Sequence, residues 1–207
     1  MFNDRYGLTA AVLLGCKTMT RRAAKKLNHP LVTDISEWGI DDKGKCYLTT
    51  TYSTGLTEVV YPPYQIGEEI AIAQPYKQCW DIYQKQLESY NDPMSLRMPY
   101  AILGDSVQET AGWTNKMFVK ADYMPHAIRI KSIKAERLQD ISEEDCLREG
   151  IVRTACVAPY GFTIGNGKWK CYRTPRDAFS TLIDKVCKRG TWNSNPWVFA
   201  YEFELLR

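Results

Sequence analysis

The spacing of apolar and polar positions along the chain predicts several short strands. Apolar residues alternate with polar ones in several segments, which is the period of a β-strand. A turn at residues 41–44 and Gly55 separate three of these segments, as in successive hairpins. The predicted strands are residues 46–52, 57–61, 69–73, 127–137 and 197–206, with a further short strand before the turn at 41–44.

Three helices are expected between the strands. The first covers residues 4–14. Ser142-Glu143-Glu144-Asp145 resembles a capping box and opens a short helix that ends at Gly150. Thr174, followed by proline, begins the third helix, which Gly190 ends. The apolar stripe of this third helix comprises Ala178, Phe179, Leu182, Ile183 and Val186.

These elements predict one α+β domain over residues 1–207. Residues 77–115 contain many turn-forming residues, and we expect an insertion there with one short helix near residues 82–89. About six or seven short strands with three helices favour a small mixed β-barrel, closed or half-closed, with the helices packed around it.

The composition is that of a globular chain and excludes several classes of function. Hydrophobic residues make up 44% of the chain and charged residues 25%. No apolar run approaches the roughly 20 residues that cross a bilayer, and the apolar residues 8–14 have no basic region in front of them. We therefore expect no membrane partner and no signal peptide. The seven cysteines form no CxxC pair and there are two histidines, so we expect no metal, no cofactor and a reducing, cytoplasmic location.

A basic stretch follows the first predicted helix. The formal net charge of +3 permits nucleic-acid binding without arguing for it, but residues 17–26 concentrate cations with no acid among them. Within this stretch, Gly15-Cys16-Lys17-Thr18-Met19-Thr20-Arg21-Arg22 resembles the signature G-x-K-T-x-T-R-R of the ASCH domain, a branch of the PUA-like superfamily. The cations of the stretch are Lys17, Arg21, Arg22, Lys25 and Lys26.

Three further segments resemble the longer bacterial and phage members of this family, in family order. They are residues 64–68, residues 136–150 and the segment that begins at Asn195. The resemblance implies a PUA-like β-barrel whose cleft accepts a nucleotide or a modified base. The chain departs from the family pattern at Ala73-Gln74, where long members often have Arg-Glu, and at His126, where many have Arg. Either departure is consistent with a shift of ligand or a loss of activity.

The resemblance also implies a reaction. A small subfamily of ASCH proteins removes the acetyl group from acetylated cytidine, and its working Lys, Thr and Glu correspond to Lys17, Thr20 and Glu149. On a helical turn, the spacing of Lys17 and Thr20 would project both side chains to one side. Amide hydrolysis needs a nucleophile, a proton shuttle and a partner for the oxyanion. Thr20 is the nucleophile or positions it; Lys17 is the base if burial removes its proton, and otherwise Lys17 stabilises the oxyanion and Glu149 is the base.

The same cleft fits a second function, that of a non-catalytic module that binds RNA, a modified nucleoside or single-stranded DNA. The two arginines of the signature would contact phosphates, or one of them would pair with the acidic block at residues 136–149. A tryptophan in the cleft would stack on a base. The departure at Ala73-Gln74 leaves a third alternative, a phage-derived accessory protein with a vestigial cleft. The candidate binding residues are Arg21, Arg22, Lys25, Arg129 and Trp192.

Overall fold

A computed structural model describes residues 2–89, 111–155, 157–165 and 167–206. Within these residues the chain forms eleven strands and five α-helices, which confirms the mixed α+β class. The contacts divide the chain into two compact units. The larger unit holds residues 3–68 and 129–205, and the smaller unit holds residues 69–128 with the two ends of the chain.

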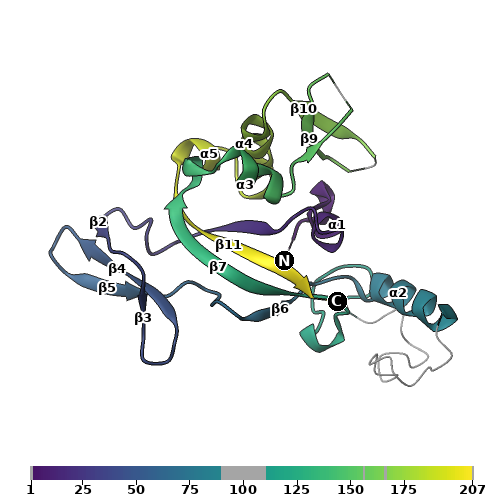
Figure 1. Ribbon diagram of the computed structural model, residues 1–207, viewed down its shortest axis with the longest axis horizontal. Coiled ribbons are helices and arrows are strands. Elements are labelled where there is room, and N and C mark those ends of the chain that lie inside the picture. Colours follow the sequence, from purple (N-terminus) through teal and green to yellow (C-terminus); the bar gives the residue numbers. More distant parts are fainter. Residues whose placement is uncertain (1, 90–110, 156, 166, 207) are drawn as a thin grey trace. The chain divides into compact units, whose positions relative to one another are not determined.

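The larger unit is built on an antiparallel sheet. Strand β1 (Met19–Ala23) pairs with β11 (Trp197–Leu206) in a register that sets Met19 opposite Glu202. On its other side β11 is flanked by β7 (Ala127–Arg137), and both long strands bend along their length (Figure 1). Residues 198–201 and Phe203 of β11 are buried, so this strand is the centre of the core. The predicted bounds of β7 and β11 are confirmed.

A second sheet in the larger unit consists of hairpins. Strand β4 (Cys46–Tyr52) pairs with β2 (Val32–Ile35), β3 (Gly39–Ile40) and β5 (Thr57–Val60). The predicted turn between β3 and β4 forms, with the Asp41 N–H donating to the Lys45 carbonyl at 3.0 Å. Alternation along β4 buries Leu48 and Thr50.

Helices cover the main sheet beside a third, three-stranded sheet. Helices α3 (Glu143–Arg148), α4 (Pro175–Val186) and α5 (Thr191–Ser194) gather at one side of β7 and β11 (Figure 1). Helix α4 also contacts β9 (Tyr160–Thr163) and β10 (Trp169–Tyr172), and β8 (Val152–Arg153) pairs with β9. The sequence analysis missed this third sheet and α5. A one-turn 3-10 helix, η6 (Leu138–Asp140), joins β7 to α3.

Two helix predictions need correction. Residues 4–14 do not form one helix, because Gly7 at φ +66° separates a 3-10 turn, η1 (Asp4–Tyr6), from α1 (Leu8–Leu13). Helix α4 begins at its Thr174 cap as predicted, but its C-cap is Cys187, and Gly190 instead begins α5. The predicted buried stripe of α4 is confirmed except at its last residue, Val186, which is only half-buried.

The smaller unit contains β6 (Glu69–Ala71), α2 (Tyr76–Ser89) and a 3-10 turn, η5 (Ala121–Tyr123). Helix α2 is longer than the short helix predicted near residues 82–89 because it already begins at Tyr76. The Tyr76 N–H donates to the Gly112 carbonyl, and the Tyr76 hydroxyl accepts from the Lys120 N–H at 2.8 Å. Residues 90–110 of the predicted insertion lie outside the described residues.

The cap of α3 is a testable element, since this helix carries two carboxylates considered below. The Ser142 hydroxyl accepts a hydrogen bond from the Asp145 N–H at 3.0 Å. We expect Ser142→Ala to lower the free energy of unfolding by about 1 kcal/mol, because that N–H loses its partner. Urea unfolding measures the change. Ser142→Asp restores a capping oxygen and should recover most of the loss; an alanine variant as stable as the natural chain would contradict this role.

Candidate functional site

Lys17 lies in the segment between α1 and β1, and its side chain is buried. Its ammonium donates to the Met19 carbonyl at 2.7 Å, to the Glu149 carbonyl at 2.7 Å and to Glu149 Oε2 at 2.6 Å. Lys17 is 2% exposed and Glu149 is 5% exposed. A protonated lysine has three N–H donors, and each of these three acceptors takes one. The structure thus brings together two residues that lie 132 positions apart in the sequence.

The end of α3 fixes the position of Glu149. Glu149 is the C-cap of this helix, and the next residue, Gly150, has φ +104°. A Cβ at Gly150 would lie 3.3 Å from Leu8 Cδ2, which is tight, and 3.5 Å from Lys17 Cδ, which is ordinary contact, so the positive φ is the main reason for glycine here. The Thr18 N–H donates to the Arg148 carbonyl at 2.9 Å, which holds the segment before β1 against α3.

Arg21, on β1, connects this strand to β7 and to α3. From β1, its Nε donates to Glu136 Oε1 on β7 at 2.8 Å. Its Nη1 donates to Glu149 Oε1 at 3.1 Å, and its Nη2 donates to Asp145 Oδ2 at 2.9 Å. Arg21 is only 6% exposed. Its planar guanidinium presents several donors in one fork, which suits contact with three carboxylates at once.

Lys134 completes the group on its solvent side. Its ammonium lies 3.0 Å from Glu136 Oε2 and 3.0 Å from Asp145 Oδ2, while its side chain is 49% exposed. Three cations therefore face three carboxylates; Arg148, at the edge of the group, also reaches Asp145, with its Nη1 3.6 Å from Oδ1. We call this group the charge cluster: Lys17, Arg21, Lys134, Glu136, Asp145 and Glu149.

Burial and pairing act in opposite directions on the cluster's pKa values. For Lys17, the loss of water lowers the pKa below its ordinary value of 10.5, and the nearby Glu149 carboxylate only partly opposes this. For Arg21, burial is outweighed by Glu149 and Glu136, so its pKa is raised. For Asp145, burial is outweighed by hydrogen bonds from Lys134 and Arg21, so its pKa is lowered. Within the cluster, Lys17 is thus the cation whose proton burial makes easier to remove.

Thr20 does not join the Lys17–Glu149 pair. It lies within β1, where neighbouring side chains point to opposite faces, so its hydroxyl faces away from the side that Arg21 occupies. No hydrogen bond links the Thr20 hydroxyl to Lys17 or Glu149 in the part of the chain that the structure describes. The assumption of a helical turn across Lys17 and Thr20 was wrong, because this segment enters a strand.

The predicted binding residues take different positions. Arg21 pairs with the acidic block, which was one of its two predicted alternatives, and its guanidinium is enclosed by carboxylates. Arg22 is half-buried, and Lys25 is exposed. Arg129 forms an exposed ion pair with Glu204 at 3.4 Å.

Trp192 is part of the packing around α4. Its ring meets Phe179 edge-on with ring centroids 6.1 Å apart, and the Arg176 guanidinium lies 5.1 Å from its ring centroid. Trp197 is half-buried, and the Arg137 guanidinium lies 4.7 Å from its ring centroid. Near the same helices, Cys146 is buried and Cys187 is exposed.

The sequence analysis missed three members of the charge cluster, Lys134, Glu136 and Asp145. Their only signal in the sequence was the acid-rich block over residues 136–149, which follows a strand in which Lys134 alternates with Glu136. Among the described residues, no group of three or more histidine, cysteine or carboxylate side chains is placed to hold a metal ion. The helices in the described ranges include none that combines the length and apolar character needed to cross a bilayer.

Comparisons of the chain with protein-family models, with curated proteins and with solved structures gave no match.

Removal of the central cation tests the structural importance of the cluster. Arg21→Leu leaves three carboxylates near one another without their shared partner, and we expect a loss of about 3–5 kcal/mol in the free energy of unfolding. Arg129→Leu, on β7 of the same sheet, removes the same charge from an exposed pair and should change stability little. Urea unfolding compares the two variants; equal losses would contradict the cluster's role.

Proposed function

We propose that this chain is a PUA-like protein of the ASCH type that binds a modified nucleoside and hydrolyses its acyl amide, with N4-acetylcytidine as the substrate class. The observation that carries the proposal is the 2.6 Å contact between Lys17 Nζ and Glu149 Oε2. The resemblance of residues 15–22 and 136–150 to the family implies the same two residues as members of its site. A buried lysine with a lowered pKa beside a specific carboxylate is a common feature of active sites.

In the proposed reaction, Lys17 acts as base and then as acid. The neutral amine of Lys17 takes a proton from a water molecule, and the water oxygen bonds to the acetyl carbon. The carbon–nitrogen bond then breaks as the Lys17 ammonium returns a proton to the nucleobase nitrogen. The products are the free nucleoside and acetic acid, which ionises. Glu149 holds the Lys17 nitrogen in position through the 2.6 Å contact. The Thr20 hydroxyl lies on the opposite face of β1, so water rather than Thr20 is the proposed nucleophile.

The burial of the pair sets a requirement for this reaction. The two side chains are 2% and 6% exposed, and each donor of the Lys17 ammonium already has an acceptor. Substrate binding must therefore displace one of these acceptors. Two of the three belong to Glu149, which Arg21 also holds through its other carboxylate oxygen, so we expect the Lys17 side chain to be the part that moves.

The same observation, that every N–H donor of the Lys17 ammonium has an acceptor, favours a second candidate function. A lysine whose donors are all satisfied also suits a purely structural role, and the chain would then be a binding module for RNA or single-stranded DNA without hydrolytic activity. In this case the charge cluster supports the fold, and exposed cations such as Lys25 contact the nucleic acid.

Acetate release from N4-acetylcytidine separates the two candidates. We expect the natural chain to release acetate and Glu149→Gln to lose at least about a hundredfold in rate, since the base loses the group that positions it. Lys17→Met should lose the activity altogether, and circular dichroism establishes that each variant is folded. Lys188→Met, which removes an exposed lysine at the end of α4, is the matched control and should retain full activity.

Thr20→Ala determines the nucleophile, because Thr20 lies outside the charge cluster and its removal should leave the fold intact. Complete loss of activity, restored by Thr20→Ser, would assign the attack to the hydroxyl, whereas retained activity would assign it to water. A folded natural chain that releases no acetate would overturn the hydrolase proposal and favour the binding module.

A further inference from the structure

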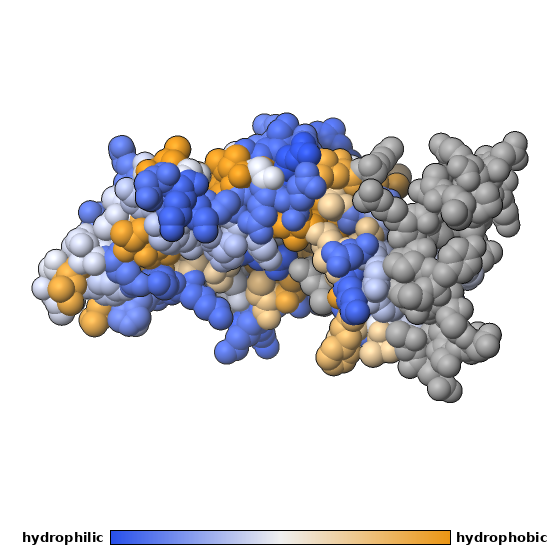
Figure 2. Space-filling model, turned by 90° about the horizontal axis from the view of Figure 1, so that it is seen from below, coloured by the Kyte–Doolittle hydropathy of each residue, from blue (hydrophilic) through white to orange (hydrophobic). Residues whose placement is uncertain are grey.

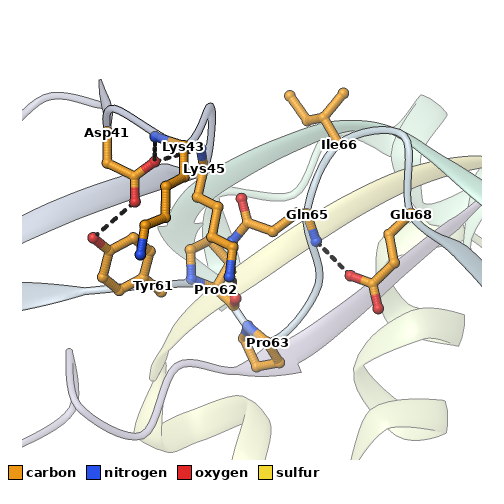
Figure 3. Close-up of a pocket in the computed structure, with 9 residues that line it drawn as sticks. All are labelled: Asp41, Lys43, Lys45, Tyr61, Pro62, Pro63, Gln65, Ile66 and Glu68. Carbon is orange, nitrogen blue, oxygen red and sulfur yellow. Dashed lines mark hydrogen bonds between the residues drawn. The ribbon is translucent and has the colours of Figure 1, made fainter.

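A hollow of about 690 Å³ lies between the β3–β4 turn and the loop that follows β5, remote in sequence from Lys17 and Glu149 (Figure 3). It shares no residue with the charge cluster. The turn contributes two lysines and an aspartate, and the loop contributes a tyrosine, two prolines and an isoleucine. The lining residues are Asp41, Lys43, Lys45, Tyr61, Pro62, Pro63, Gln65, Ile66 and Glu68.

Asp41 fixes one wall of the hollow. Its Oδ1 accepts from the N–H groups of Lys43 at 3.0 Å and Lys45 at 2.7 Å, and its Oδ2 accepts from the Tyr61 hydroxyl at 3.1 Å (Figure 3). The Asp41 carboxylate therefore holds the backbone of the turn and the tyrosine in one arrangement. These three donors are neutral, so the carboxylate keeps its negative charge, and the hollow is lined by two lysines and two carboxylates.

The Lys43 side chain ends beside the Tyr61 ring, and the Lys45 side chain ends near Pro62 (Figure 3). Neither ammonium group has a carboxylate within ion-pair distance among the residues that the structure describes. Two like charges beside each other on a surface repel, and an anion between them would remove that repulsion. The lysine wall of the hollow thus suits a phosphate group.

Gln65 fixes the opposite wall. Its Oε1 accepts from the Cys46 N–H at 2.8 Å, and its Nε2 donates to the Pro62 carbonyl at 3.2 Å. The Gln65 N–H donates in turn to Glu68 Oε2 at 2.8 Å, which engages the second carboxylate of the hollow (Figure 3). The proline pair is consequently held in place beside the lysines.

An aromatic surface adjoins the lysines. Tyr61 is 46% exposed, and its ring centroid lies 6.0 Å from that of Tyr47. The Tyr47 ring occupies the space where a side chain at position 39 would stand, since a Cβ on Gly39 would be 2.4 Å from Tyr47 Cζ. At the left of Figure 2, the end formed by the hairpins shows apolar and weakly polar side chains among hydrophilic ones. Val59 and Tyr61 are among the exposed residues of β5 and the loop after it.

We propose that this hollow binds a single-stranded nucleic acid, with a backbone phosphate between Lys43 and Lys45 and a base on the surface formed by Tyr61 and Pro62. Cations beside an exposed aromatic ring are the combination that such strands require, because the phosphate needs charge and the unpaired base needs a flat apolar partner. A duplex keeps its bases stacked and cannot use the ring. The proposal does not depend on the hydrolytic function, since no residue is shared.

Fluorescence anisotropy with a labelled 12-residue oligouridine tests the proposal. The double variant Lys43→Ala, Lys45→Ala should weaken binding about tenfold or more and reduce the slope of log K against log salt by about 0.7, which corresponds to the loss of the one phosphate that the two lysines share. Lys185→Ala, Lys188→Ala removes two exposed lysines at the end of α4 and is the matched control, with binding and slope unchanged. The substituted lysines are exposed in both variants, so both should fold.

The tyrosine provides an independent readout. Tyr61→Ala should weaken binding about tenfold by the loss of stacking, while Tyr61→Phe retains the ring and should remain within about twofold of the natural chain. The proposal is overturned if the oligouridine does not bind, or if the control lysine pair has the same effect as Lys43 and Lys45. Equal binding of poly-glutamate, of a duplex or of uridine monophosphate would also overturn it, because charge alone or a single nucleotide would then suffice.

Discussion

The burial of the Arg21 guanidinium among three carboxylates is the interaction on which the larger unit depends. It joins β1 to β7 through Glu136 and to α3 through Asp145 and Glu149. A charge removed from water loses several kcal/mol of hydration, and the loss is offset only when partners surround the charge. Arg21 can therefore be buried only if α3 stands where its carboxylates reach the guanidinium. The helix is placed by this requirement as well as by apolar contacts.

Lys17 occupies the remaining side of the same arrangement. Glu149 uses one carboxylate oxygen for Lys17 and the other for Arg21, so the two cations share one acid. With Arg21 fixed, Glu149 cannot follow Lys17 if the lysine moves, and this makes the lysine the more separable member of the group. The same geometry thus gives a rigid support and, beside it, an amine whose burial lowers its pKa. This combination is the basis of the proposed hydrolytic role.

Much of the framework could be predicted from the sequence, because it depends on local patterns. The bounds of β4, β7 and β11 follow from alternation, and the starts of α3 and α4 follow from their capping residues. The third sheet was missed because β9 and β10 are four residues each and β10 is largely exposed, which leaves little alternation to detect. The helix predicted at residues 4–14 was wrong because Gly7 adopts a positive φ that ends the first turn.

Less of the candidate site could be predicted from the sequence. Family resemblance named Lys17 and Glu149, but the roles of Asp145 and Lys134 depend on contacts between β7 and α3 that no local pattern encodes. The position of Thr20 was misjudged for the same reason, because only the pairing of β1 with β11 determines which face its side chain takes. No sequence motif marks the hollow between the β3–β4 turn and the loop after β5, because two segments that are separate in the sequence form it.

The protonation of Lys17 is the most direct measure of this account. Burial lowers the pKa of Lys17 by more than the Glu149 carboxylate raises it, so the amine should titrate below its ordinary pKa of 10.5. Selective ¹³C labelling of the lysines at Cε, with Lys17→Met to assign the signal, allows that titration to be followed by NMR. A Lys17 signal that titrates well below 10.5 would support an amine able to exchange a proton in a reaction. Titration at or above 10.5 would contradict the account and leave Lys17 as a purely structural cation.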